Sequence, residues 1–176
     1  TISKAGSLMR DGSADEMLLR RGDTWHETFG LWSKSGRSAT EPMVIGAYGS
    51  GARPVVASGT AVAFNTGRSS HPRVDHLAIM GIRFWADARD PSSPTFSTTA
   101  VGGGYGLRFA DASNDLLIED CAVQGYATDI AFYSVFGPST NVRVRRCVVT
   151  DAYAKTGNAA GLFAYLVNGL TLDGNV

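Results

Sequence analysis

Aromatic and charged residues recur in three short segments of alternating polarity, Gly106–Phe109, Asp129–Tyr133 and Gly161–Tyr165. Alternation with a period of two residues is typical of a half-buried β-strand, and it places Leu107, Ile130 and Leu162 on the inner face. The outer face then carries the side chains that could do chemistry: Arg108, Asp129, Tyr133, Phe163 and Tyr165. This face is the first candidate for a functional site.

Tyr133 and Tyr165 occupy matching places in their segments, so neighbouring strands would bring them together in an aromatic stripe with Phe163. Sugar rings present apolar faces to exposed aromatic side chains, so such a stripe favours carbohydrate binding. The alternative is an ordinary stabilising ladder of outer-face side chains.

Charged residues in the neighbouring loops could add acid–base chemistry. Lys155, in the loop Asp151–Ala160 with Asp151 and Tyr153, is the best candidate for a general base or a partner of a substrate carboxylate. Its alternative is a solvated loop lysine. Arg108 and Asp129 are weaker catalytic candidates, and the loop from Asp87 to Ser97 could wall a groove with its own charged residues, which are Asp87, Arg89 and Asp90.

Metal-binding patterns are not evident, and no cofactor is predicted from the residues. Calcium needs three or more clustered oxygen ligands, whereas the acidic residues are scattered along the chain. Cys121 and Cys147 have no third Cys or neighbouring His in register with them. We expect them to point inward as small hydrophobes, and a disulfide between them is the less favoured alternative.

A repeat positions these residues. Segments beginning at Asn114, Asn141 and Asn168 follow each other at equal intervals along the chain. Their apolar anchors Ile118, Val144 and Leu172 recur at nearly the same spacing, and so do the two cysteines. A weaker copy covers Asp75–Phe84, and the wider gap from its Ile79 to Ile118 indicates one coil plus an insertion through Pro91–Pro94.

Three short strands in a turn of about 27 residues are typical of a right-handed parallel β-helix with three sheets. Helical repeats would need apolar residues at i, i+3, i+4 and i+7, which these segments lack. The predicted fold is therefore an all-β solenoid, in which Asn114, Asn141 and Asn168 form a structural ladder at a turn.

The N-terminal region is expected to differ from the coils. Residues 1–16 are predicted to cap the solenoid through a short helix, whose apolar face holds Ile2, Ala5, Leu8 and Met9. Residues 17–176 would form the coils of a single domain, with early strands within Met17–Trp25 and Pro42–Val56. The sequence stops at Val176 inside a strand-like motif, so we expect an excerpt of a longer chain.

Composition excludes some classes of function. With 16 basic and 16 acidic residues the formal net charge is zero, which argues against a general binder of nucleic acid or of anionic membranes. No apolar run approaches the roughly 20 residues of a membrane span. The start of the sequence does not read as an export leader, and the oligomeric state is not predicted.

A family resemblance rests on the run "RRGDTW" from Arg20, a loop, "EPMVIGAYGSGARPVV" from Glu41 and the Asn-anchored coils. Over nearly the whole chain this pattern resembles the pectate-lyase-like (pectin lyase-like) superfamily. The shared motifs belong to the scaffold, so they are specific for the fold rather than for an activity.

The resemblance implies a secreted, periplasmic or cell-surface protein whose partner is an acidic polysaccharide. If the protein is an enzyme, a lyase or epimerase that abstracts a proton from a uronate is favoured, with Lys155 or Arg108 as base and Ca²⁺ as an implied cofactor. A non-catalytic binding or structural module, as in adhesins and fibres, is the alternative. Glycoside hydrolysis comes next, since it needs two facing carboxylates and only Asp129 is suitably placed; a catalytic site beyond Val176 is also left open.

Overall fold

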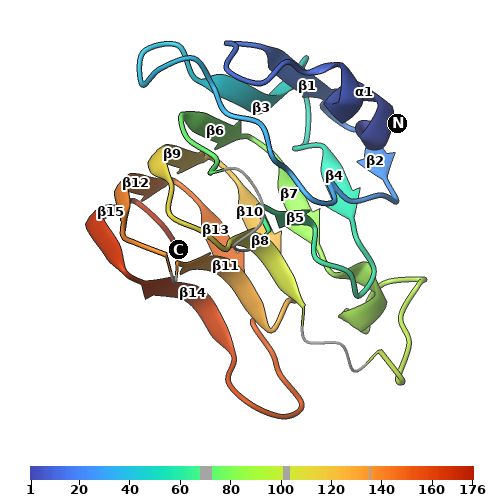
Figure 1. Cartoon of the computed structure of the whole chain (residues 1–176). Coiled ribbons are helices and arrows are strands. Elements are labelled where there is room, and N and C mark those ends of the chain that lie inside the picture. Colours follow the sequence, from blue (N-terminus) through green and yellow to red (C-terminus); the bar gives the residue numbers. More distant parts are fainter. Residues whose placement is uncertain (68–72, 101–103, 135) are drawn as a thin grey trace.

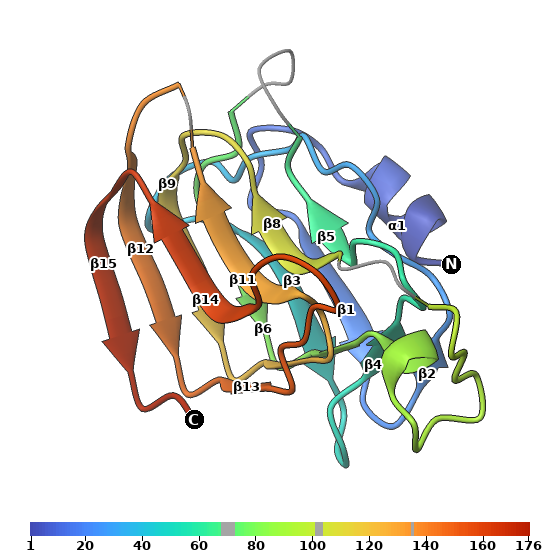
Figure 2. The same cartoon turned by 90° about the horizontal axis from the view of Figure 1, so that it is seen from below.

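The computed structural model describes residues 1–67, 73–100, 104–134 and 136–176. Its strands form three sheets in which every pair is parallel, and the chain visits the sheets in turn as it winds along the molecule (Figures 1 and 2). This arrangement confirms the predicted parallel β-helix. Each full coil contributes one strand to each sheet, so inner side chains are buried by the equivalent residues of the coils above and below.

The largest sheet has six strands, in spatial order β1 (Glu16–Arg20), β3 (Met43–Tyr48), β6 (Leu77–Met80), β9 (Asn114–Glu119), β12 (Ser139–Arg145) and β15 (Val167–Asp173). The second sheet consists of β2 (Thr24–Trp25), β4 (Val55–Ala57), β7 (Arg83–Trp85), β10 (Ala122–Gln124) and β13 (Val148–Thr150). The third consists of β5 (Phe64–Asn65), β8 (Tyr105–Phe109), β11 (Thr128–Tyr133) and β14 (Ala160–Tyr165). All the segments predicted as strands lie in these three sheets.

The register confirms the predicted column of apolar anchors. Ile79 pairs with Ile118, Ile118 with Val144, and Val144 with Leu172. The wider gap between the first two is thus one coil that carries an insertion. This insertion joins β7 to β8 and contains a short 3-10 helix, η1 (Asp87–Arg89).

The predicted asparagine ladder is wrong by one residue. Thr140, not Asn141, pairs with both Asn114 and Asn168. Asn141 instead lies level with Asp115, and its side-chain amide donates a hydrogen bond to the Asp115 carboxylate. Successive coils therefore differ slightly in length here, and the equal intervals between asparagines do not mark equivalent positions.

The position level with Asn141 has a conformational requirement of its own. Its four occupants in successive coils all have positive φ, between 52° and 76°: His76, Asp115, Asn141 and Gly169. Gly, Asn, Asp and His are the residues that adopt this left-handed conformation most readily. His76 occupies this position in the coil before Asp115, and its Nδ1 lies 2.9 Å from the Asp115 carboxylate.

The interior is apolar, and both cysteines are part of it. Cys121 and Cys147 are fully buried free thiols, as predicted for inward-pointing residues. The Cys121 thiol donates to the carbonyl oxygens of Ile79 and Glu119, and burial raises its pKa. These contacts make the pair a structural part of the core.

The helix α1 (Ile2–Leu8) lies at the N-terminal end of the solenoid, as predicted (Figure 1). Ile2 and Met9 are buried in the core, but Leu8 is exposed, so the prediction for that residue is wrong. The helix ends at Leu8, and Met9 already has extended backbone angles, which turns the two residues to different sides. The Lys34 ammonium donates to the carbonyls of Gly6 and Met9 and so satisfies the helix C-terminus.

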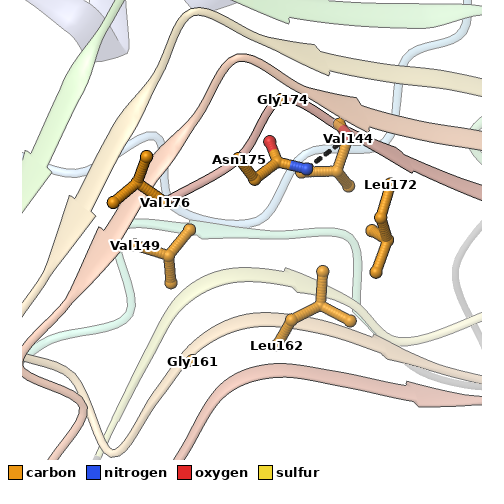
Figure 3. Close-up of a pocket in the computed structure, with 8 residues that line it drawn as sticks. All are labelled: Val144, Val149, Gly161, Leu162, Leu172, Gly174, Asn175 and Val176. Carbon is orange, nitrogen blue, oxygen red and sulfur yellow. Dashed lines mark hydrogen bonds between the residues drawn. The ribbon is translucent and has the colours of Figure 1, made fainter.

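At the other end, the inner side chains of the last coil line a hollow of about 430 Å³ (Figure 3). Asn175 is one of the lining residues, and its amide donates to the carbonyl oxygen of Val144 (Figure 3). Its side-chain oxygen accepts from the backbone N–H of Cys147. The remaining lining residues are Val149, Gly161, Leu162, Leu172, Gly174 and Val176.

Gly106 is a position where the packing excludes any side chain. A Cβ there would lie 2.5 Å from both the Asp129 carbonyl oxygen and Val123 Cγ1. We expect Gly106→Ala to lower the free energy of unfolding by about 2 kcal/mol, the usual cost of overpacking a core. Urea denaturation followed by circular dichroism measures this loss. Gly157→Ala is the comparison variant: its Cβ would meet no atom within 4 Å, but its φ is positive, so it measures backbone strain without overpacking.

Candidate functional site

The aromatic stripe predicted from the sequence is present on the outer face of β11 and β14. Tyr133 pairs with Tyr165, and their ring centroids lie 5.6 Å apart at an interplanar angle of 30°. Phe163 adds a third ring, 6.0 Å from Tyr133. Phe163 and Tyr165 are exposed and Tyr133 is partly buried. These three residues are referred to below as the aromatic cluster.

Arg108 lies on the same outer face. It pairs with Ala131, which pairs in turn with Phe163, so the three residues form one row across β8, β11 and β14. With about 4.8 Å between strands, Arg108 and Phe163 are separated by roughly 10 Å of backbone. The Arg108 guanidinium lies 5.0 Å from the centre of the Tyr105 ring, and no described carboxylate forms an ion pair with it.

The predicted outward position of Asp129 is wrong, because its side chain is fully buried. One carboxyl oxygen accepts the backbone N–H of Tyr126 at 3.1 Å, and the other has no hydrogen-bond partner among the described residues. Gly106 and Gly161 stand at the same level in the adjacent coils. Burial raises the pKa of Asp129 to about 8, so the group is mostly protonated at neutral pH and cannot contact a polymer on the surface.

Lys155 is exposed on the loop that precedes β14. It lines a small hollow of about 120 Å³ with residues that include Arg89, Phe96 and Tyr153. Phe163 and Tyr165 are the fourth and sixth of the six residues of β14, so they lie about 10 to 17 Å along the strand from its start. The structure therefore does not bring Lys155 together with the aromatic cluster.

The loop Asp87–Ser97, predicted to wall a groove, meets the loop Asp151–Ala160 at the corner between the second and third sheets. Arg89 of η1 donates to the carbonyl oxygens of Gly125, at 2.8 Å, and of Tyr153. A pocket of about 510 Å³, called here the corner pocket, lies between the loops. Its lining residues are Arg89, Asp90, Pro91, Phe96, Gln124, Gly125, Asp151 and Tyr153.

Some expectations for these loops need revision. Arg89 and Asp90 line the corner pocket, but Asp87 is buried and accepts hydrogen bonds from the Gly59 N–H and the Thr95 hydroxyl. Phe96 was not singled out from the sequence, although a lone aromatic residue in a segment of Ser, Thr and Pro was an available signal. Gln124 was also missed, and only its outward position after Val123 could have indicated it.

Within the described ranges, no three His, Cys, Asp or Glu side chains gather in a way that could hold a metal ion. No helix in that part of the chain is both long and apolar enough to cross a membrane. Comparisons with protein-family models, with curated proteins and with solved structures find no match to this chain. The fold and the surface geometry are therefore the basis for any functional proposal.

Proposed function

We propose that this β-helix binds an acidic polysaccharide along the outer face of β8, β11 and β14. The observation that carries the proposal is the exposed aromatic cluster, whose rings follow one another from strand to strand. Aromatic faces of this kind fit the apolar faces of successive sugar rings. In the absence of a ligand, Phe163 and Tyr165 remain exposed, so their rings contribute little to the stability of the fold.

Arg108 supports the acidic character of the polymer. Its charge is held over the Tyr105 ring rather than neutralised by a described carboxylate. A uronate carboxylate bound beside Phe163 would gain a charge-assisted hydrogen bond from a guanidinium in the same row. An acidic polysaccharide is also the ligand class that the resemblance to the pectate-lyase-like superfamily implies. Membership of that superfamily and a secreted or cell-surface location are part of the proposal.

Binding without catalysis fits this geometry better than an enzyme does. Lys155 lies far along the strands from the aromatic cluster, and Asp129 is buried. An inverting or retaining glycosidase needs two carboxyl groups facing the sugar, and none of the described outer-face residues of β8, β11 and β14 supplies an exposed one. A lyase would have to use Arg108, with Ca²⁺ as the cofactor that the resemblance implies.

Affinity electrophoresis in gels that contain polygalacturonate or alginate tests the proposal. We expect Tyr133→Ala/Tyr165→Ala to abolish the retardation seen for the wild-type chain while the thermal unfolding midpoint changes little. Arg108→Gln should weaken retardation in acidic gels and leave any retardation by neutral glucans unchanged. Equal retardation of the wild type and the double variant would show that the aromatic cluster is only structural.

Incubation with the same polymers separates the enzymatic alternatives. A rise in the absorbance of unsaturated products would establish a lyase, and Arg108→Gln would then be expected to remove the activity. A rise in reducing ends alone would establish a hydrolase. No change in either signal, together with retardation in the gel, is the result expected for a binding module.

A further inference from the structure

The corner pocket has the dimensions and the lining of a ligand site, and it is separate from the aromatic cluster. Its volume of about 510 Å³ falls within the range of small-molecule sites, roughly 300–1,000 Å³. The insertion after β7 forms one wall and the loop after β13 forms the other. Two segments that are distant in the sequence thus build it together.

Aromatic side chains come from both walls. Phe96 of the insertion is 41% exposed, and Tyr153 of the loop is 57% exposed. The Arg89 guanidinium lies 5.2 Å from the centre of the Tyr153 ring and also donates to the Tyr153 carbonyl oxygen. Tyr153 is therefore fixed at the pocket edge while much of its surface stays available.

The polar groups of the pocket are mostly acceptors, and the fold holds them in place. Asp90 accepts hydrogen bonds from the indole N–H of Trp85 and from the backbone and hydroxyl of Ser92. Asp151 accepts from the amide of Gln124 at 3.0 Å, and the Gln124 oxygen accepts from Arg83 at 2.7 Å. Carboxylates and amides that are preoriented in this way suit a ligand with several hydroxyl donors.

Charge restricts the ligand further. The lining residues carry two carboxylates, Asp90 and Asp151, and one guanidinium, Arg89. Arg89 already donates to two backbone carbonyls and covers the Tyr153 ring, so it positions the loop rather than presenting its charge to a ligand. The Arg83 guanidinium, which acts on Asp90 from outside the lining, likewise has other partners, the Gln124 oxygen and the Trp85 ring. An anionic sugar would therefore meet two carboxylates, while both guanidinium groups are already engaged.

From these observations we infer that the corner pocket binds an uncharged sugar unit, stacked against Phe96 and Tyr153 and hydrogen-bonded through its hydroxyls to Asp90, Asp151 and Gln124. The inference rests on the proposed function only for the choice of carbohydrate as ligand class. It assigns different sugars to two places: acidic units to the outer face with Arg108, and neutral units to the corner pocket.

Saturation-transfer NMR and calorimetric titration with small glycosides test the inference on the whole chain carrying Tyr133→Ala/Tyr165→Ala, which removes the aromatic cluster so that binding to the outer face does not contribute. The probes are methyl glucoside, methyl galactoside and methyl mannoside, each beside its uronic acid counterpart, and methyl glucosaminide as a cationic probe. We expect at least one neutral glycoside to bind, and its uronate counterpart to bind about tenfold more weakly or not at all.

Variants assign the binding to the pocket. Tyr153→Ala should weaken binding of the neutral glycoside about tenfold, while Tyr48→Ala, a matched change of an exposed tyrosine outside both sites, should leave it unchanged. Asp151→Asn keeps an acceptor for Gln124 but removes a negative charge. The difference in dissociation constant between the neutral glycoside and its uronate should therefore become smaller. Equal thermal unfolding midpoints show that each variant is folded.

Three results would overturn the inference: a uronate that binds as tightly as its neutral counterpart, binding of the glucosaminide alone, or neutral binding that Tyr153→Ala leaves intact. Absence of binding by every small glycoside overturns it as well. None of these results bears on the outer face, because retardation by acidic polymers depends on Tyr133 and Tyr165. Failure of the two proposals can thus be told apart.

Discussion

Replacing Phe109 by alanine is expected to lower the free energy of unfolding by about 4 kcal/mol. The Phe109 ring is buried between Phe64, with centroids 5.6 Å apart, and Phe132, with centroids 5.1 Å apart and planes only 18° from parallel. Truncation removes the apolar contact area and leaves a cavity in the middle of the stack. Because coils are stabilised by their neighbours, the loss affects the coils on both sides.

Urea denaturation followed by circular dichroism measures the effect of Phe109→Ala, provided that the dependence of the unfolding free energy on urea stays the same. Phe136→Ala is the matched control: Phe136 is 60% exposed, and a change of less than about 0.5 kcal/mol is expected. Phe109→Leu should lose less than the alanine variant. A loss below about 1 kcal/mol for Phe109→Ala would contradict the tight packing of Phe109 between Phe64 and Phe132.

Asp129→Asn is expected to remove a large pH dependence of stability. Burial raises the pKa of Asp129 from 3.8 to about 8 in the folded chain. The native state therefore keeps a proton that the unfolded chain has released between these two pH values. Stability from this group is present in full below pH 4 and is lost as the pH rises towards 8.

The size of the effect follows from about 1.36 kcal/mol per pH unit, which makes about 4 kcal/mol between pH 4 and pH 7. Asparagine has nearly the same shape as the protonated acid and can still accept the Tyr126 N–H, so the variant should lack this loss. The stability of the variant relative to the wild type is expected to rise steadily over that range. Other carboxylates affect both proteins alike and cancel in the difference.

Chemical denaturation at pH 4, 5.5, 7 and 8.5 measures the difference between Asp129→Asn and the wild type. The matched control is Asp173→Asn, which makes the same change at an exposed aspartate of β15. A constant difference across the series would show that Asp129 ionises in the folded chain much as an exposed carboxyl does.

The fold could be predicted from the sequence because its signal is local and repeated. Alternating apolar residues mark the strands, and the recurrence of Ile118, Val144 and Leu172 marks the coils. The inward thiols and the pairing of Tyr133 with Tyr165 followed from the same regularity. In each case a side chain needed only the period of its own strand to find its place.

The register of the strands between successive coils was harder to predict from the sequence. The equally spaced asparagines suggested one ladder, but the pairing of Thr140 with Asn114 and Asn168 moves Asn141 one position along. A shift of one residue in a strand exchanges its two faces, so register depends on the whole set of inner contacts rather than on one residue type. Backbone conformation, with positive φ at Asp115 and Asn141, marks the true equivalence.

The sequence by itself therefore determined the solenoid and the outer aromatic residues, while the tertiary structure decided the burial of Asp129 and the corner pocket. Asp129 is buried within the stack of coils, level with Gly106 of the preceding coil and Gly161 of the next. The pocket exists because stacking of β7, β10 and β13 brings the insertion and the loop after β13 to one corner. Both depend on contacts between distant residues, which no local pattern of the chain encodes.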